Sequence, residues 1–319
     1  MRPTSVKPMV EAGIMASVSI LFALISAYVP LLGVLVNLIW PVPIVLLGVR
    51  HGLKWSVMAT AVAGVLIAIL VQPLHAITMV LGLGLIGIVL GYAFRRKMSP
   101  AATILWGSVA SLVSKAAILG LGMVTLGVNP LAAMPEAMEK AVSQALDIYR
   151  GLGAPEQVLE QMQTQLQPMV KLLPVVIPAS LLLAAVVDTF LNFLIAKTVL
   201  RKLGQPVAGF APFKDWVLPR WILYFYALAI LMIYHGSKEQ MELLYKAGMN
   251  LQILSTALLL LQGLSVFYFL ADKYNLSRIQ RGIILMMTFV IPVVSSIAVF
   301  AGAFELVLDY RKLRTVRSQ

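Results

Sequence analysis

One apolar stretch decides the fold, Asn37-Leu-Ile-Trp-Pro-Val-Pro-Ile-Val-Leu-Leu-Gly-Val-Arg-His-Gly52, and it carries no charge before Arg50. Pro41 and Pro43 lie in its middle, and each proline removes a backbone hydrogen-bond donor. Inside a lipid bilayer an unpaired backbone group is costly, so a broken helix persists only where protein or a cavity satisfies it. A short apolar segment interrupted by proline therefore indicates a binding site in transporter-like proteins.

Asn37 and Trp40 lie directly before this break and are the first candidate ligand-pocket residues. Their amide and indole groups are suited to hydrogen bonding with a small molecule and to stacking on it. The alternative is a kinked packing helix, with Trp40 anchored at the membrane interface. The residues by themselves leave both interpretations open.

The composition is that of a membrane protein. Apolar residues make up 60% of the chain and charged residues 12%, and several apolar runs reach the roughly 20 residues that cross a bilayer core. Lysine and arginine outnumber aspartate and glutamate by 25 to 13. In a membrane protein this excess indicates basic cytoplasmic loops facing anionic lipid, so we expect the bilayer and not nucleic acid as a partner.

The residue types also exclude several chemistries. The chain contains no cysteine, so it has no disulfide, zinc-thiolate site or cysteine nucleophile. Its three histidines lack the spacing of a helical metal site, and no GxxxxGK[ST] motif for ATP is present. The carboxylates show no HExxH or GxSxG signature. We expect no metal, no cofactor and no enzymatic activity.

The expected fold is all-α, a polytopic membrane protein with about 8–10 membrane helices. The apolar segments lie at residues 11–28, 34–49, 55–71, 76–94, 101–127, 169–199, 217–235, 250–271 and 282–308. Placing Arg50, Arg95 and Arg201 inside makes the N-terminus cytoplasmic. A single crossing by 282–308 would then put the basic tail outside, so this segment is predicted either to cross once or, as Pro292 suggests, to form two short helices.

Residues 128–168 differ from the rest, because acidic residues lie between apolar residues at helical spacing. This pattern predicts an amphipathic helical hairpin, too polar to cross the membrane, on the external side. The hairpin would be either a lid or a surface cover. The expected organisation is a six-helix membrane bundle in residues 1–200 that contains this insert, followed by additional membrane helices in 201–319 with a basic cytoplasmic tail.

Small residues mark two faces for close helix packing. Ala12 and Ala16 lie one turn apart in the first apolar segment. The string Gly82, Gly84, Gly87 and Gly91 resembles a nucleotide-binding GxGxxG pattern, but it lies in a membrane segment, where glycine indicates close packing of helices.

Three polar residues are expected deep inside the membrane. Lys115 lies near the middle of its apolar segment, far from either end. A lysine in the middle of a membrane span normally faces the bundle interior and a partner. Asp188 and Asn192 are one helical turn apart and share a face. At 1.5 Å per residue, Lys115 and Asp188 have similar depths, roughly 20 Å from the inner surface. We predict a buried ion pair or a shared polar site and name all three as ligand-pocket candidates; the alternative is that each meets water or a carbonyl separately.

The first two hundred residues resemble the substrate-binding (S) components of energy-coupling-factor transporters. The resemblance rests on the first-helix string Ala12-Gly-Ile-Met-Ala16, the short second helix, the Gly-Val-Arg-His-Gly52 turn and the glycine-rich fourth helix. It implies a small-molecule ligand. It also implies that Ala12 and Ala16 dock on a transmembrane coupling subunit, which works with ATPases.

The whole chain resembles the YybS-like family of uncharacterised bacterial membrane proteins. The strings that carry this resemblance are Leu-Ile-Trp-Pro-Val-Pro43, Leu-Gly-Val-Arg-His-Gly-Leu-Lys-Trp55, Phe-Leu-Asn-Phe193 and Leu-Asp-Tyr-Arg-Lys312. It implies a multi-pass protein of the bacterial cell membrane and brings no established activity. Both the 128–168 insert and the residues beyond 200 depart from the S-component pattern.

Two functions from different classes follow from these observations. The first is a substrate-binding membrane protein that captures a small molecule and relies on partner subunits for energy. The alternative is a non-transport scaffold or regulator that binds other membrane proteins. A co-purified metabolite would favour the first, and a stable membrane-protein partner without a ligand would favour the second.

Overall fold

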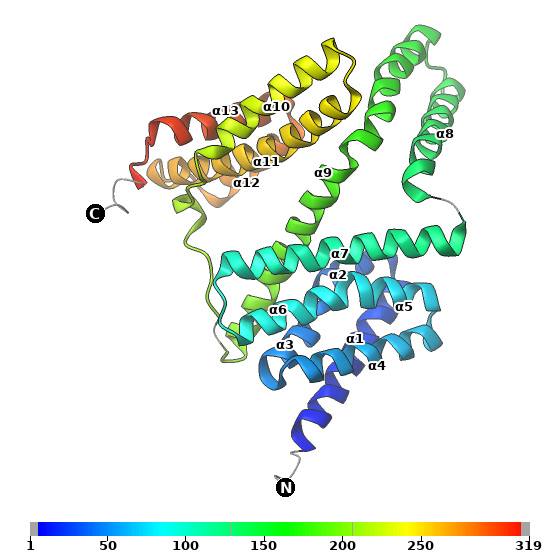
Figure 1. Cartoon of the computed structure of the whole chain (residues 1–319), viewed down its shortest axis with the longest axis vertical. Coiled ribbons are helices and arrows are strands. Elements are labelled where there is room, and N and C mark those ends of the chain that lie inside the picture. The colour runs from blue at the N-terminus through cyan, green and yellow to red at the C-terminus, as the bar shows by residue number, and fades with distance from the viewer. Residues whose placement is uncertain (1–5, 128, 206, 314–319) are drawn as a thin grey trace. The chain divides into compact units, whose positions relative to one another are not determined.

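The computed structural model describes residues 6–127, 129–205 and 207–313, and every regular element in these ranges is a helix (Figure 1). The extreme N-terminus and the last arginines of the basic tail lie outside the described residues. The all-α class predicted from the sequence is therefore confirmed.

Within the described ranges, seven helices are long and apolar enough to cross a membrane, which confirms a polytopic membrane protein. They are Val6–Tyr28, Leu31–His51, Leu53–Leu70, Pro73–Arg95, Pro100–Thr125, Glu156–Lys202 and Glu242–Lys273. Helix α10 (Trp221–Lys238) occupies the segment predicted at 217–235 but is not among the seven, and its last turn carries His235 and Lys238.

The last apolar segment forms two helices. Helix α12 (Arg278–Val290) and helix α13 (Pro292–Leu308) are bent by 102° at the break between them, a geometry that fits either a broken eighth span or a re-entrant loop. Pro292 begins α13 and lacks the N–H that would continue the preceding helix. The two-helix form of 282–308 is thus the one that the structure contains.

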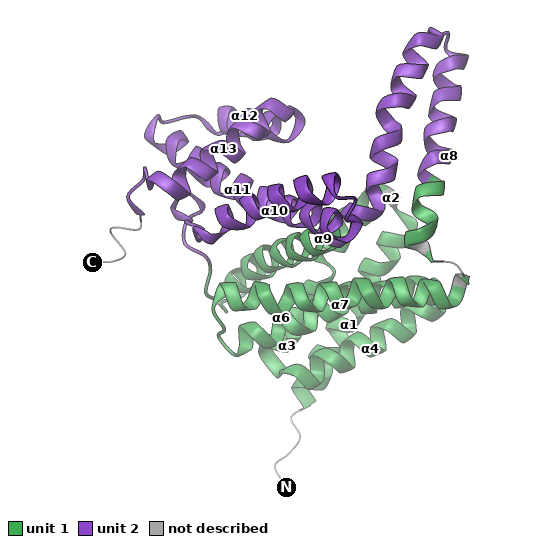
Figure 2. Cartoon of the chain, turned by 45° about the horizontal axis from the view of Figure 1, so that its top comes forward, with its two compact units in different colours: residues 1–137, 180–209 green, residues 138–179, 210–319 purple. Residues whose placement is uncertain are grey.

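The chain divides into two compact units (Figure 2). Unit 1 comprises residues 1–137 and 180–209, and unit 2 comprises residues 138–179 and 210–319. The expected hairpin is present as helix α8 (Pro130–Gly151) and the first part of helix α9 (Glu156–Lys202). This division differs from the expected one, because most of 128–168 groups with the C-terminal helices and α9 is one 47-residue helix that contributes to both units.

In unit 1, the proline-interrupted stretch becomes helix α2 (Pro30–Ile39) and helix α3 (Pro41–His51), which meet at Trp40. Every residue from Pro41 to Gly48 is buried. The Trp40 side chain is fully buried, and its indole N–H donates to Ser19 O at 2.9 Å. Helix α3 is therefore packed into the interior of unit 1.

Glycine lets α3 touch helix α6 (Leu85–Arg95) backbone to backbone. A Cβ added to Gly48 would lie 3.0 Å from Gly91 Cα, and one added to Gly91 would lie 3.0 Å from Val45 O. Any side chain at these positions would push the helices apart, so the predicted packing role of the glycines is confirmed. The same apolar segment begins with helix α5 (Pro73–Met79) and a π-helical turn, η1 (Val80–Gly84).

In unit 2, helix α9 runs through three internal prolines, Pro168, Pro174 and Pro178. A side chain of helix α11 (Glu242–Lys273) supports it there. Asn250 Oδ1 accepts from Ala179 N at 2.8 Å, while Asn250 Nδ2 donates to Val175 O at 2.7 Å. This amide bridges two backbone groups that an undisturbed helix would pair with each other, which explains how α9 continues past its prolines.

A buried ion pair ties together the C-terminal part of unit 2. The Arg311 side chain is fully buried, and its Nε donates to Glu305 Oε1 at 2.8 Å. The guanidinium also donates to Ser265 Oγ at 2.9 Å, to Trp216 O at 2.8 Å and to Lys214 O. Arg311 therefore donates to backbone carbonyls of the segment before α10, around the short 3-10 turn η2 (Phe213–Asp215). Carbonyl groups are acceptors only, so they need such a donor.

The contact of α13 with α11 generates a stability prediction. A Cβ on Gly302 would lie 2.1 Å from Leu259 O, so Gly302→Ala must separate the two helices. We expect a loss of about 1–3 kcal/mol, seen as a lower thermal unfolding temperature in detergent. Gly282→Ala is the control, since a Cβ there meets nothing within 4 Å; equal losses in both variants would contradict the close contact.

Candidate functional site

The predicted pairing of Lys115 with Asp188 is present. Lys115, on helix α7 (Pro100–Leu126), forms an ion pair with the Asp188 carboxylate of α9 and also donates to Ser111 Oγ at 3.1 Å. The side chains are 25% and 41% exposed, respectively. The pair is thus only partly buried, and part of each side chain is accessible to another molecule.

Buried polar groups continue from this pair along the same two helices. Asn192 Nδ2 donates to Asp188 O at 2.8 Å, which fixes the amide on the face that carries the carboxylate. Within α7 and α9, both in the described part of the chain, three buried side-chain oxygens have no hydrogen-bond partner: Asn192 Oδ1, Thr189 Oγ1 and Ser108 Oγ. Because buried polar atoms are normally bonded, these oxygens are suited to a water molecule or a polar ligand.

The other two pocket candidates are engaged elsewhere. Asn37 Oδ1 accepts from Ser26 Oγ at 2.8 Å. The indole of Trp40 is enclosed in the core and bonded to Ser19, so no face of it is open for stacking. The structure thus brings together Lys115, Asp188 and Asn192, and the contacts of Trp40 fit the packing interpretation of the proline-interrupted stretch instead.

Ala12 and Ala16 are also inside the chain. Their exposed fractions are 8% and 3%, and they belong to a core cluster that includes Trp40 on the α2–α3 span and Ala59 and Ala63 on helix α4 (Leu53–Leu70). The small-residue face of helix α1 (Val6–Tyr28) therefore accommodates the chain's own helices. The expectation that these two alanines dock on a partner is not supported, because the face is already filled.

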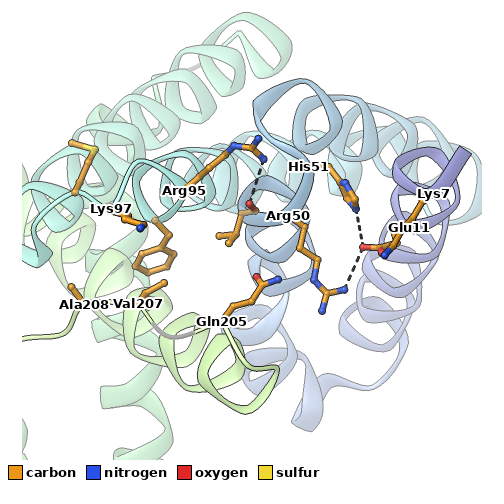
Figure 3. Close-up of a pocket in the computed structure, with 12 residues that line it drawn as sticks. Lys7, Glu11, Arg50, His51, Arg95, Lys97, Gln205, Val207 and Ala208 are labelled. Carbon is orange, nitrogen blue, oxygen red and sulfur yellow. Dashed lines mark hydrogen bonds and ion pairs between the residues drawn. The ribbon is translucent and has the colours of Figure 1, made fainter. Parts of the chain in front are cut away.

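A second polar site, which the sequence reasoning missed, lies at one end of unit 1 (Figure 3). Glu11 Oε2 accepts from His51 Nε2 at 2.9 Å and pairs with Arg50 Nη1 at 3.3 Å. Arg95 Nη1 donates to Val49 O at 3.4 Å. The sequence contains one signal for this site, since Glu11 is the only acidic residue before Glu136.

The helices and the polar groups between them define a polytopic α-helical membrane protein. The chain belongs to the family described as "Predicted membrane protein (DUF2232)", whose model matches residues 17–306. It is 26% identical over 303 residues to "Uncharacterized protein YybS" of Bacillus subtilis (strain 168), which covers 94% of this chain and 96% of the relative. No solved structure matches the chain. The YybS-like resemblance is confirmed, and the S-component resemblance stays a prediction.

The ion pair predicts non-additive losses of stability. Lys115→Met or Asp188→Leu alone strands one charge inside the membrane, whereas the double variant strands none. We expect the sum of the two single-variant losses in unfolding free energy to exceed the loss in the double variant by about 1–3 kcal/mol. Thermal or denaturant unfolding measures these losses. The exposed pair of Asp147 and Arg150 is the control, and its losses should be nearly additive; additive losses at Lys115 and Asp188 would contradict the pairing.

Proposed function

We propose that the protein binds a small, partly polar molecule at the Lys115–Asp188 pair and takes part in transport energised by partner subunits. The observation that supports this proposal is the pair itself, an ammonium and a carboxylate far from the ends of α7 and α9, with the carboxylate side chain 41% exposed. Ionisable residues inside membrane spans are costly, and those that occur usually mark substrate or ion pathways.

The groups around the pair indicate the chemistry of the ligand. Lys115 attracts a negative or electron-rich group, and Asp188 attracts a donor or a positive group. The unpartnered oxygens of Asn192, Thr189 and Ser108 add further hydrogen-bonding capacity. A compact molecule that carries both a donor and an acceptor, such as a zwitterion or an amide, would satisfy Lys115 and Asp188 together.

Energy would have to come from other proteins, because the sequence has no GxxxxGK[ST] motif of its own. We propose a transmembrane coupling subunit and ATPases as partners, as the S-component resemblance implies. Their docking surface would differ from the Ala12 and Ala16 face, which the chain's own helices fill.

The same exposed carboxylate supports a second candidate function, a non-transport scaffold or regulator. A polar residue on a helix of another membrane protein would satisfy Asp188 as well as a ligand would, since interhelical hydrogen bonds stabilise association in lipid. The two candidates differ in what accompanies the purified protein.

Native mass spectrometry of the detergent-purified protein distinguishes them. We expect the wild type to retain a small molecule and Asp188→Asn to lose it, because the isosteric amide removes the charge that balances Lys115. Asp147→Asn is the matched control, since Asp147 lies in an exposed ion pair on α8. A membrane-protein partner without any small molecule would replace the transport proposal with the scaffold.

The proposed orientation places the N-terminus and Arg50, Arg95 and Arg201 in the cytoplasm and residues 128–168 outside. The reason is the lysine and arginine bias of the short loops. In this cysteine-free chain, Glu139→Cys should react with a membrane-impermeant maleimide in intact cells. Lys202→Cys should react only after lysis. The reverse pattern of labelling would invert the topology.

A further inference from the structure

A basic cavity of about 880 Å³ lies in unit 1, and it shares no residue with the Lys115–Asp188 site. Its lining comes from α1, the ends of α3 and α6 and the segment after α9 (Figure 3). The residues that line it are Lys7, Glu11, Val49, Arg50, His51, Phe94, Arg95, Lys97, Met98, Gln205, Val207 and Ala208. Four lysine and arginine side chains thus surround a cavity with one carboxylate.

The surplus of positive charge is not neutralised within the protein. Glu11 is shared by Arg50 and His51. In the described part of the chain, Lys7, Arg95 and Lys97 form no ion pair with a carboxylate, and the sequence supplies no other acidic residue before Glu136. Basic residues at the C-terminal ends of α3 and α6 interact favourably with the helix dipoles. This interaction accounts for the basic residues but not for the cavity between them.

Local geometry holds the cationic groups around the cavity. Gly52 has φ +95°, and a Cβ there would lie 3.3 Å from the Arg95 guanidinium carbon, so glycine leaves room for Arg95 against the α3–α4 turn. Glu11 fixes Arg50 from the side of α1. Gln205 Oε1 is a buried acceptor with no partner among the described residues, and it adds a place for a hydroxyl or amine donor.

We propose that this cavity binds a phosphate group whose substituent carries a hydroxyl or an amine. Guanidinium groups match phosphate oxygens in a planar fork, and lysine adds point charges. A cavity of about 880 Å³ is of the size of small-molecule sites. The Gln205 acceptor complements the donor of the substituent, which chloride would leave unsatisfied.

Such a group has two sources, a phospholipid head group and a soluble phosphate compound. The cavity lies where the apolar helices α3 and α6 end in Arg50 and Arg95, and arginine at the end of an apolar helix is suited to the lipid phosphates of the membrane surface. A soluble ligand would enter the same cavity from water. Both sources require the same cationic lining.

The experiment uses the full chain and two probes. The protein is reconstituted in bilayers of equal parts phosphatidylglycerol and phosphatidylcholine, and native mass spectrometry measures which lipid it retains. In a parallel arm, glycerol 3-phosphate is titrated against the thermal unfolding temperature in neutral detergent, with chloride at equal ionic strength as the reference. Arg95→Gln removes a lining guanidinium. Arg96→Gln is the matched control, because Arg96 stacks on Tyr92 and does not line the cavity.

We expect Arg95→Gln to weaken retention or apparent affinity about tenfold, since a charge-assisted hydrogen bond is lost. Arg95→Lys should fall between the wild type and Arg95→Gln, and Arg96→Gln should match the wild type. Selective retention of phosphatidylglycerol supports the lipid source, and stabilisation by glycerol 3-phosphate beyond chloride supports the soluble source. The proposal is overturned if neither probe binds, or if Arg96→Gln weakens binding as much as Arg95→Gln.

Discussion

Unit 1 depends on the burial of most of one short helix, from Pro41 to Gly48 of α3. This part of α3 is covered on all sides, so its neighbours must approach with small residues. Gly87 and Gly91 of α6 do so against Ile44 and Val45. The small residues Ala12, Ala16, Ala23, Ala59 and Ala63 of α1 and α4 belong to the same core cluster as Ile44 and Leu47 of α3. Lipid is as apolar as the helix surfaces, so close packing and hydrogen bonds hold them together. The bonds from Trp40 to Ser19 O and from Ser56 to Ile44 O, both 2.9 Å, are of this kind.

This dense packing determines where polar chemistry can occur. A helix interface built from glycine and alanine leaves no volume for a ligand, and the prolines of α3 are enclosed by protein instead of opening a cavity. Ionisable groups therefore collect where the packing ends, at the α7–α9 pair and at the basic ends of α3 and α6. The two sites differ in character, because the first is balanced in charge and the second carries a surplus of cations.

Unit 2 uses polar side chains to secure irregular backbone. Arg311 and Glu305 form a fully buried pair, whose desolvation is costly unless further hydrogen bonds satisfy the guanidinium. Ser265 and the carbonyls of Lys214 and Trp216 supply those bonds. Asn250 does the same for the proline-rich part of α9. Removing Asn250 would take a partner from Val175 O and Ala179 N, whereas Trp216 O would still accept from Gln262 and Ser265 without Arg311.

The sequence by itself determined the membrane class, the approximate helix bounds, the packing role of the glycines and the Lys115–Asp188 pair. Hydropathy, glycine spacing and depth along a helix are local properties that follow directly from the order of residues in the chain. Only the tertiary structure decided that Trp40 is enclosed, that Ala12 and Ala16 face the protein's own helices, and that Glu11 meets Arg50 across 39 residues. These outcomes depend on which helix faces meet, and one apolar helix face looks much like another until its neighbours are placed.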